Sequence, residues 1–217
     1  MQGIFFNDFN NAYIPEILKE LYRDKVYAEY IERHGRKDLE IIDCGGNVGL
    51  FTYYVYPYAK RIYTIEPSKQ HLDVLNYMLE FNKMTDKVTV IPKALANENG
   101  NLKFYHNTNT TMFSLKENVN NKPDEIEEVE AITVDTLFTQ YNVKHIDFLK
   151  LDVEGSESEI IGGNGFEQVA DKIDSLVVEY HAWSNTNPNQ LVNTLRDYGF
   201  DVKKIPTQAV LFGAKRK

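Results

Sequence analysis

A glycine-rich turn that directly follows a short apolar run constrains this chain more than any other feature. Residues 39–42 have the length and composition of a buried strand, and the turn over residues 43–49 reads D-C-G-G-N-V-G. Apolar residues at steps of three and four then predict a helix over residues 48–58, which Pro57 shortens. Glycines allow a tight turn and a close approach to a ligand, so this strand, turn and helix predict an α/β fold with a binding site at the turn.

The same pattern continues along the chain. Its alternation predicts a doubly wound, mostly parallel sheet with an antiparallel closing strand. A β addition is expected near residues 102–133, with a polar stretch over residues 107–128 that is either a lid or a disordered loop. We expect one domain over residues 1–217, in which residues 1–35 form a helical N-terminal extension. Ser68 stands where the N-cap of a helix over residues 68–79 is expected. The expected strands are 61–65, 88–91, 146–151 and 175–180, the other expected helix is 189–198, and the expected closing hairpin is 202–205 with 209–212.

Composition narrows the classes of partner. A formal charge of −8 argues against a long nucleic-acid backbone, because such binding depends on lysine and arginine. The sequence contains neither a membrane-spanning apolar run nor a secretory leader, so we expect a cytoplasmic protein that does not bind membranes. The single cysteine, Cys44, has no intramolecular partner for a disulfide.

The residue types of the turn indicate its ligand. A dinucleotide site needs a third glycine where Cys44 stands, and Asp43 would repel a pyrophosphate. The methionine end of S-adenosylmethionine (SAM) carries an ammonium group for Asp43 and a carboxylate for the backbone amides, and therefore fits better. Glu66 ends the second strand at about the spacing expected of an acid that binds ribose hydroxyls, and Pro67 and Ser68 are expected to shape the wall beside the adenine.

Acidic residues and one histidine follow two further strands. Asp152 and Glu154 come after the strand that ends at residue 151, and ligands of open α/β sheets lie at such carboxyl ends. Glu179 and His181 end the next strand and lie on the same side of it. We predict His181 as the general base, with Asp152 and Glu154 orienting the acceptor.

The same group of residues offers ligands for a metal. Asp152, Glu154, Glu179 and His181 could converge on magnesium or manganese, since hard oxygens with one imidazole suit these ions. We do not favour a metal site. Lys150 could hold a neighbouring carboxylate, although lysines at strand ends are usually solvated.

Five motifs in order resemble the FkbM family of SAM-dependent methyltransferases. They cover roughly residues 39–182 and read IIDCGGNVGLFT, IYTIEPSKQHLDVLNYMLEFN, VIPKALANENGNLKFY, ITVDTL and IDFLKLDVEGSESEIIGG. The resemblance implies a class I, Rossmann-like methyltransferase fold with the β addition. It also implies O-methylation of a hydroxyl on a sugar or a small metabolite.

The resemblance further implies roles for individual residues. Glu66 would take the ribose, Ala94 and its neighbours would border the adenine, and Asp152 and Glu154 match the family's acidic motif. The methionine part of SAM would lie against Asp43, Gly45, Asn47 and Gly49.

Three rivals stay open. The chain could bind SAM without catalysis, it could methylate with the help of a divalent metal, or, less favoured because of Cys44, it could be an NAD-dependent oxidoreductase. The sequence does not reveal the acceptor or the oligomeric state.

Overall fold

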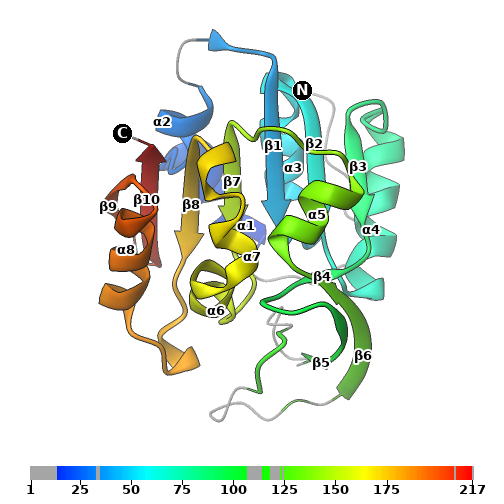
Figure 1. Ribbon diagram of the computed structural model, residues 1–217. Coiled ribbons are helices and arrows are strands. Elements are labelled where there is room, and N and C mark those ends of the chain that lie inside the picture. The colour runs from blue at the N-terminus through cyan, green and yellow to red at the C-terminus, as the bar shows by residue number, and fades with distance from the viewer. Residues whose placement is uncertain are drawn as a thin grey trace.

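Seven strands form the central sheet, in the order β3-β2-β1-β7-β8-β10-β9 (Figure 1). The computed structural model describes residues 14–32, 35–106, 114–117, 123, 125–207 and 209–216. Strand β1 pairs in parallel with β2 on one side and β7 on the other, and β10 runs antiparallel between β8 and β9. The predicted doubly wound sheet with an antiparallel closing strand is confirmed. Its strands are β1 (Leu39–Cys44), β2 (Ala59–Ile65), β3 (Val88–Ile91), β7 (Phe148–Leu151), β8 (Ser175–Glu179), β9 (Phe200–Pro206) and β10 (Val210–Arg216).

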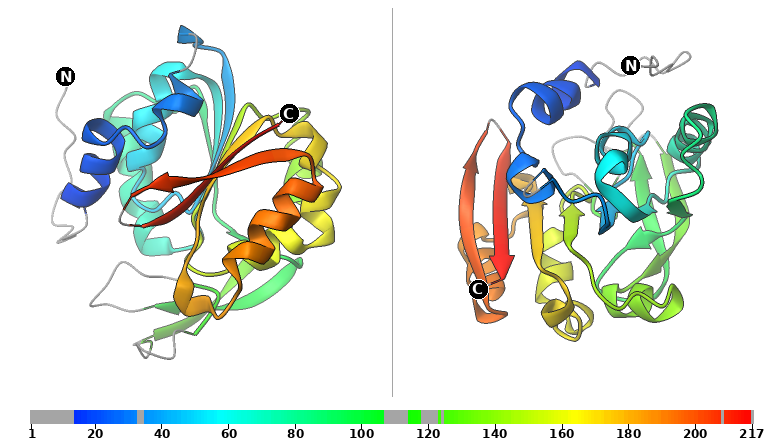
Figure 2. Two further views of the ribbon diagram at one scale, coloured as in Figure 1. Left: turned by 90° about the vertical axis from the view of Figure 1, so that its left-hand side faces the viewer. Right: turned by 90° about the horizontal axis from the view of Figure 1, so that it is seen from above.

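Helices cover both faces of this sheet (Figure 2). One face carries the short N-terminal elements together with the helices that follow β1 and β2. They are α1 (Ile14–Leu18), the π-helix η1 (Lys19–Arg23), α2 (Ala28–Ile31), α3 (Leu50–Val55), the 3₁₀ turn η3 (Tyr56–Tyr58) and α4 (Lys69–Phe81). The other face carries α5 (Val134–Gln140), α6 (Glu157–Gly162), α7 (Asn164–Glu167), η4 (Ala170–Lys172) and α8 (Pro188–Asp197), with η5 (Ala182–Ser184) after β8.

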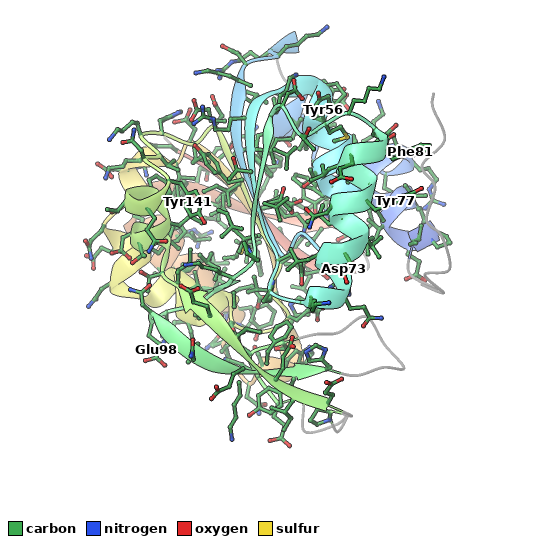
Figure 3. All side chains as sticks on the ribbon, turned by 90° about the vertical axis from the view of Figure 1, so that its right-hand side faces the viewer. Tyr56, Asp73, Tyr77, Phe81, Glu98 and Tyr141 are labelled. Atoms are coloured by element: carbon green, nitrogen blue, oxygen red, sulfur yellow. The ribbon has the colours of Figure 1, made fainter. Side chains whose placement is uncertain are left out.

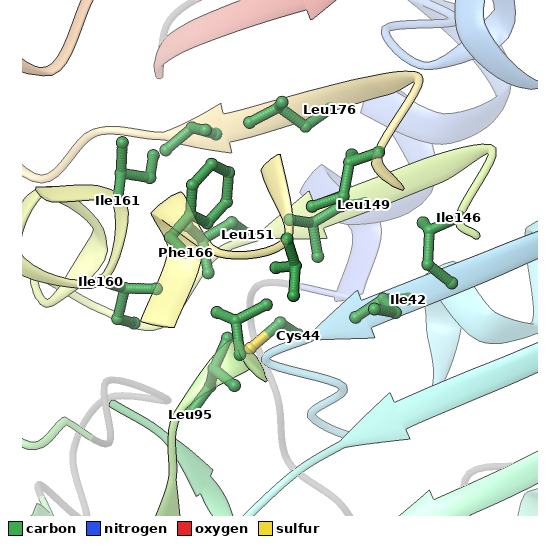
Figure 4. Close-up of a cluster of buried hydrophobic side chains, with 14 of the residues drawn as sticks. Ile42, Cys44, Leu95, Ile146, Leu149, Leu151, Ile160, Ile161, Phe166 and Leu176 are labelled. Carbon is green, nitrogen blue, oxygen red and sulfur yellow. The ribbon is translucent and has the colours of Figure 1, made fainter. Parts of the chain in front are cut away.

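Alternation along β1 divides the core between the two faces. Ile41 belongs to the cluster under α2 and α3, whereas Ile42 belongs to the cluster under α5 to α8, and both side chains are fully buried. Figure 4 shows the second cluster, in which Ile42 and Cys44 of β1 lie with Leu149 of β7 and with Phe166 of α7. Because both faces of the sheet are covered, its strands read as nearly continuous apolar runs.

Helix α4 shows how the sequence sets one of these layers. The Ser68 side chain caps its first turn by accepting a hydrogen bond from the backbone N–H of His71, as the sequence predicts. Leu75 is buried against the sheet, whereas Tyr77 and Phe81 stack on the outer side of the helix (Figure 3). The apolar stripe therefore fixes which side of the helix faces the core.

A second sheet lies beyond the carboxyl ends of the parallel strands (Figure 1). It consists of β4 (Ala94–Leu95), β6 (Glu125–Ile132) and β5 (Gly100–His106), in that order, and confirms the expected β addition. Most of the stretch over residues 107–128 lies outside the described residues. None of the helices in the described ranges has both the length and the apolar character that a bilayer span requires.

The N-terminal extension is helical in short pieces. Of the helical extension expected over residues 1–35, residues 1–13 and 33–34 lie outside the described residues, and the rest contains α1, the π-helix η1 and the single turn α2. The π-helix places Leu21 in the core, and Tyr27, just before α2, packs on Phe51 and Phe148. Tertiary packing of these aromatic rings therefore outweighs local helical propensity.

Candidate active site

The turn after β1 is built for close approach of the backbone. Gly45 has φ +80°, and a Cβ on it would overlap the backbone carbonyl oxygen of Asp152, at the end of β7. Gly49 has φ +90°, and a Cβ there would lie 2.6 Å from Cδ1 of Leu75 in α4. Gly45 thus lets the β1 turn reach the β7 end, and Gly49 lets α3 pack on α4.

The amide groups of the turn bind protein acceptors. The N–H groups of Gly45 and Gly46 both donate to the carbonyl oxygen of Ile65, and that of Asn47 donates to Oε2 of Glu66 at 2.8 Å. Residues 48 and 49 likewise donate within the turn. These bonds hold the turn rigidly, but they occupy amides that the sequence led us to expect against a ligand carboxylate.

Asp43 is fully buried behind the turn. Its Oδ2 accepts a hydrogen bond from the Thr52 hydroxyl at 2.6 Å, and its Oδ1 lies 3.8 Å from Nζ of Lys150. Burial raises the pKa of the Asp43 carboxyl to about 6, although Lys150 acts to lower it. The carboxylate therefore faces protein groups, and its predicted contact with the methionine ammonium stays a prediction.

Lys150 is a buried cation between two carboxylates. Only 7% of the residue is exposed, and Nζ donates to Oδ2 of Asp152 at 3.0 Å and to the carbonyl oxygen of Gly45 at 3.2 Å. Burial acts to lower the pKa of Lys150, but Asp152 and Asp43 together raise it, so the ammonium group stays charged. The lysine therefore holds the carboxylates rather than standing in solvent, as a strand-end lysine usually does.

Glu66 closes the site at the end of β2. Besides accepting from Asn47, its carboxylate accepts the backbone N–H of Ser68 at 2.9 Å and lies 3.2 Å from Nδ1 of His71. The residue is 4% exposed. Each carboxylate oxygen has more than one acceptor position, so Glu66 keeps capacity for a hydroxyl while its orientation is fixed.

His181 lies at the centre of an acidic cluster. Its Nδ1 is 3.0 Å from Oε1 of Glu157, and its Nε2 is 3.2 Å from Oε2 of Glu154. The same Nε2 lies 3.9 Å from Glu179 and 4.0 Å from Asp152. The ring therefore gathers four carboxylates that come from the ends of two neighbouring strands and from the start of α6.

The cluster controls which of its members carry protons. Burial acts to lower the pKa of His181, but the hydrogen bond with Glu157 and the charge of Glu154 raise it to about 10. Burial raises the pKa of Glu154 to about 7, and burial together with Asp152 raises that of Glu179 to about 8. At neutral pH the imidazole ring is thus charged, and the groups that exchange protons are the two glutamates.

The turn that carries Glu154 is held by Glu157. Glu154 and Gly155 both have positive φ, at 55° and 102°. Oε1 of Glu157 accepts the backbone N–H groups of Val153 at 3.1 Å and Gly155 at 3.0 Å. Sequence reasoning gave Glu157 no role, because the pattern E-G-S-E carries no signal that its carboxylate would support this strained turn.

A cavity of about 640 Å³ connects these groups, within the range of small-molecule sites. Gly45, Asn47 and Glu66 line it at one end, beside Pro67 and Ala94. Asp152, Glu154 and Glu179 line its middle. Of the other predicted site residues, Asp43, Gly49, Ser68 and His181 lie behind the wall, where they position groups that reach the cavity.

The N-terminal elements contribute a stretch of cavity residues that sequence reasoning missed, among them Glu20 and Tyr27. Glu20 of η1 and Tyr27 line the cavity together with Asp152 and Glu179. Burial and the charge of Asp152 raise the pKa of the Glu20 carboxyl. No motif marks either residue, because only the packing of the extension on the sheet brings them to the site.

Three side chains of the cluster are also close enough to one another to bind a single metal ion. One ligand atom from each of Asp152, Glu157 and His181 lies within 4.8 Å of the others. This set shares only Asp152 and His181 with the four residues expected from the sequence. A similar group at the other end of the sheet, formed by His145, Asp147 and Asp174, is far from the cavity lining.

Comparisons with known proteins place the chain in a family. Residues 43–202 match the model of the Methyltransferase FkbM domain. The methyltransferase sdnD of Sordaria araneosa is 28% identical over 213 residues, which are 82% of this chain and 81% of that protein.

Two solved structures share the fold. The methyltransferase FkbM of Methylobacillus flagellatus KT superposes with a TM-score of 0.60 at 17% identity, over 86% of this chain and 47% of that one, so this chain spans about half of its length. The magnesium protoporphyrin IX methyltransferase of Synechocystis PCC 6803, solved with bound SAM, gives a TM-score of 0.55 at 14% identity over 94% and 82% of the two chains. Since the family model covers most of the chain, the protein belongs to the FkbM family of methyltransferases.

Proposed function

We propose that the protein binds SAM in this cavity and transfers its methyl group to a hydroxyl of a sugar or another small metabolite. One observation supports this best: Gly45 and Glu66 line the same cavity. Gly45 leaves room because it has no Cβ, and the Glu66 carboxylate is held in a fixed orientation. A plain glycine turn would not need an acid fixed opposite it. The cavity is also large enough for a nucleoside and a small acceptor together.

The cofactor's parts would contact different residues. The ribose hydroxyls would bind Glu66, and the adenine would lie between Pro67 and Ala94. The methionine part would lie along Gly45 and Asn47, with Asp43 acting through Lys150 from behind the wall. Bound SAM would supply an electrophilic methyl group, and Asp152, which lines the middle of the cavity, would lie on the acceptor side of it.

A proton must leave the acceptor hydroxyl when its oxygen attacks the methyl carbon. The sequence suggested His181 as the base, but its ring nitrogens already face Glu157 and Glu154, and the ring is charged at neutral pH. We therefore assign the proton to Glu179, which lines the cavity and has a pKa near 8. His181 would act as a positioning residue that holds the glutamates, and Asp152 and Glu154 would orient the acceptor.

The test of this function combines binding with product detection. Calorimetric titration should show SAM binding and no binding of NAD. Incubation with methyl-labelled SAM and a panel of sugars, polyols and hydroxylated metabolites should yield a methylated product. At saturating SAM, Glu179→Gln should lower turnover by about 10²-fold or more, whereas the surface control Glu98→Gln should not change it. Binding of SAM without any product from the panel would favour the non-catalytic alternative.

Metal assistance is the second candidate, supported by the close ligand atoms of Asp152, Glu157 and His181. We favour a site without metal, because Lys150 and the charged His181 already supply two cations to this cluster. Exhaustive chelation should therefore leave the rate unchanged. A rate that falls on chelation and returns with magnesium or manganese would reverse this preference.

A further inference from the structure

In the middle of the cavity, the acidic side chains are more exposed than the two cationic side chains that pair with them. The side chains of Asp152, Glu154 and Glu179 are each 26% exposed, and all three line the cavity. The Lys150 side chain is 9% exposed and that of His181 is 13% exposed. A ligand in this space thus meets the acids first.

Glu20 extends this acidic wall from the opposite side, since η1 packs over the carboxyl ends of β7 and β8 and its glutamate lines the same cavity. Of the other lining cations, Lys19 of η1 is half-buried, whereas Lys25 and the hairpin residues Lys203 and Lys204 are exposed.

Above about pH 8 both Glu154 and Glu179 have lost their protons, so the carboxylates in the middle of the cavity outnumber the cations of Lys150 and His181. A positive charge placed there then gains favourable interactions with several carboxylates.

Tyr27 adds a hydroxyl that is open to this space. The residue is 4% exposed and lines the cavity, and its hydroxyl oxygen, unlike that of Tyr30, is not among the described polar atoms that are both buried and without a hydrogen-bond partner. Its ring is fixed by edge contacts with Phe51 at 4.8 Å and Phe148 at 6.2 Å between centroids. A fixed phenol on the cavity wall is therefore available to a ligand that enters the acidic part of the cavity.

We propose that this acidic wall recognises the sulfonium charge, so that the protein binds SAM more tightly than its demethylated product S-adenosylhomocysteine (SAH). The proposal rests on the proposed function, because it assumes that SAM occupies the cavity. In the reaction the carbon–sulfur bond breaks, the sulfur keeps the electron pair and becomes neutral, and a carbon–oxygen bond forms. The hydroxyl proton passes to Glu179, so ligand and wall each lose one charge and the product is released more easily.

The size of the effect follows from Coulomb's law. A unit charge about 4 Å from one carboxylate changes affinity by far more than tenfold at the effective dielectric of a partly buried site, and desolvation together with the cations of Lys150 and His181 offsets much of this gain. We expect SAM to bind at least about tenfold more tightly than SAH. Sinefungin, which carries a protonated amine in place of the methylated sulfur, should bind like SAM.

Titration calorimetry at about pH 8.5, where Glu154 and Glu179 are ionised, and at fixed salt tests this with three ligands, namely SAM, SAH and sinefungin, on the folded full chain. Glu154→Gln and Glu20→Gln should each reduce the SAM preference over SAH severalfold while changing SAH binding little. The surface control Glu98→Gln, which removes a charge outside the cavity lining, should leave the preference unchanged. Should Glu154→Gln fail to fold, Glu20→Gln on the partly exposed η1 still decides the question.

The outcomes separate this proposal from the function on which it rests. If neither SAM nor SAH binds the wild-type protein, the proposed function fails and this proposal fails with it. If both bind and SAH binds as tightly as SAM or more so, the function stands and the charge recognition is overturned. A preference for SAM that both glutamine variants leave intact also overturns the assignment to these carboxylates.

Discussion

Replacing Lys150 with methionine should destabilise the fold strongly, because the lysine is a buried cation between Asp43 and Asp152. Methionine keeps the length of the side chain but leaves both carboxylates without their cation. Breaking a buried ion pair by removing one partner typically costs about 3–5 kcal/mol of unfolding free energy. For a chain of 217 residues this corresponds to a fall in melting temperature of about 6–20 °C.

The loss should depend on pH in a defined direction. The folded-state pKa of Asp43 is raised to about 6 from an ordinary 3.8, so a proton on this carboxyl favours the folded state. Without Lys150 that pKa rises further, and the Lys150→Met protein should therefore be less impaired at pH 5 than at pH 8. Adding Asp43→Asn, which removes the stranded charge, should recover part of the loss.

Chemical denaturation at both pH values measures these effects. The control Lys60→Met removes the cation of an exposed ion pair with Glu40 and should change the unfolding free energy by less than about 1 kcal/mol. If Lys150→Met costs no more than this control, or costs the same at pH 5 and pH 8, the central role given to the buried lysine is wrong.

Two further predictions concern the cofactor and the proton. Gly45→Ala should lower SAM affinity by more than about tenfold in calorimetry, because its Cβ would overlap the Asp152 carbonyl and its φ is +80°, whereas Gly162→Ala, where a Cβ meets open space, should bind normally. Turnover at saturating SAM should rise with pH through about 8 as Glu179, whose pKa burial and Asp152 raise, loses its proton. A flat profile between pH 6 and 9, or one that falls, would contradict the assignment of Glu179 as proton acceptor.

The sequence predicted the fold well because periodicity and local signals agreed. The strand before Asp43, the turn glycines and the Ser68 cap each depend on neighbours in the chain, and each appears as expected. The topology rules of parallel sheets predict that β1 and β7 are neighbours, as they are in the structure. The same rules predict that Asp152 and Glu154 lie at the carboxyl ends of the strands, where they line the cavity. Within the described residues 14–32, the expected helical extension is divided into short pieces because its shape depends on packing.

The site could be predicted less completely, since its details depend on contacts between distant segments. Proximity of Asp43, Lys150 and Asp152 follows from strand order, but the burial that makes Lys150 a structural cation does not. Glu157 and His181 meet only after the turn at Gly155 has folded back. The charge on the imidazole is thus a tertiary property, and sequence reasoning alone favoured a neutral base.

The most direct test of the central claim is a crystal structure of the protein with SAH. The account predicts one ligand in the cavity, with its ribose hydroxyls on the carboxylate of Glu66, its adenine between Pro67 and Ala94, and its sulfur directed toward Asp152. An empty cavity in crystals grown at saturating SAH, or a nucleoside bound elsewhere with Glu66 contacting only protein groups, would contradict it.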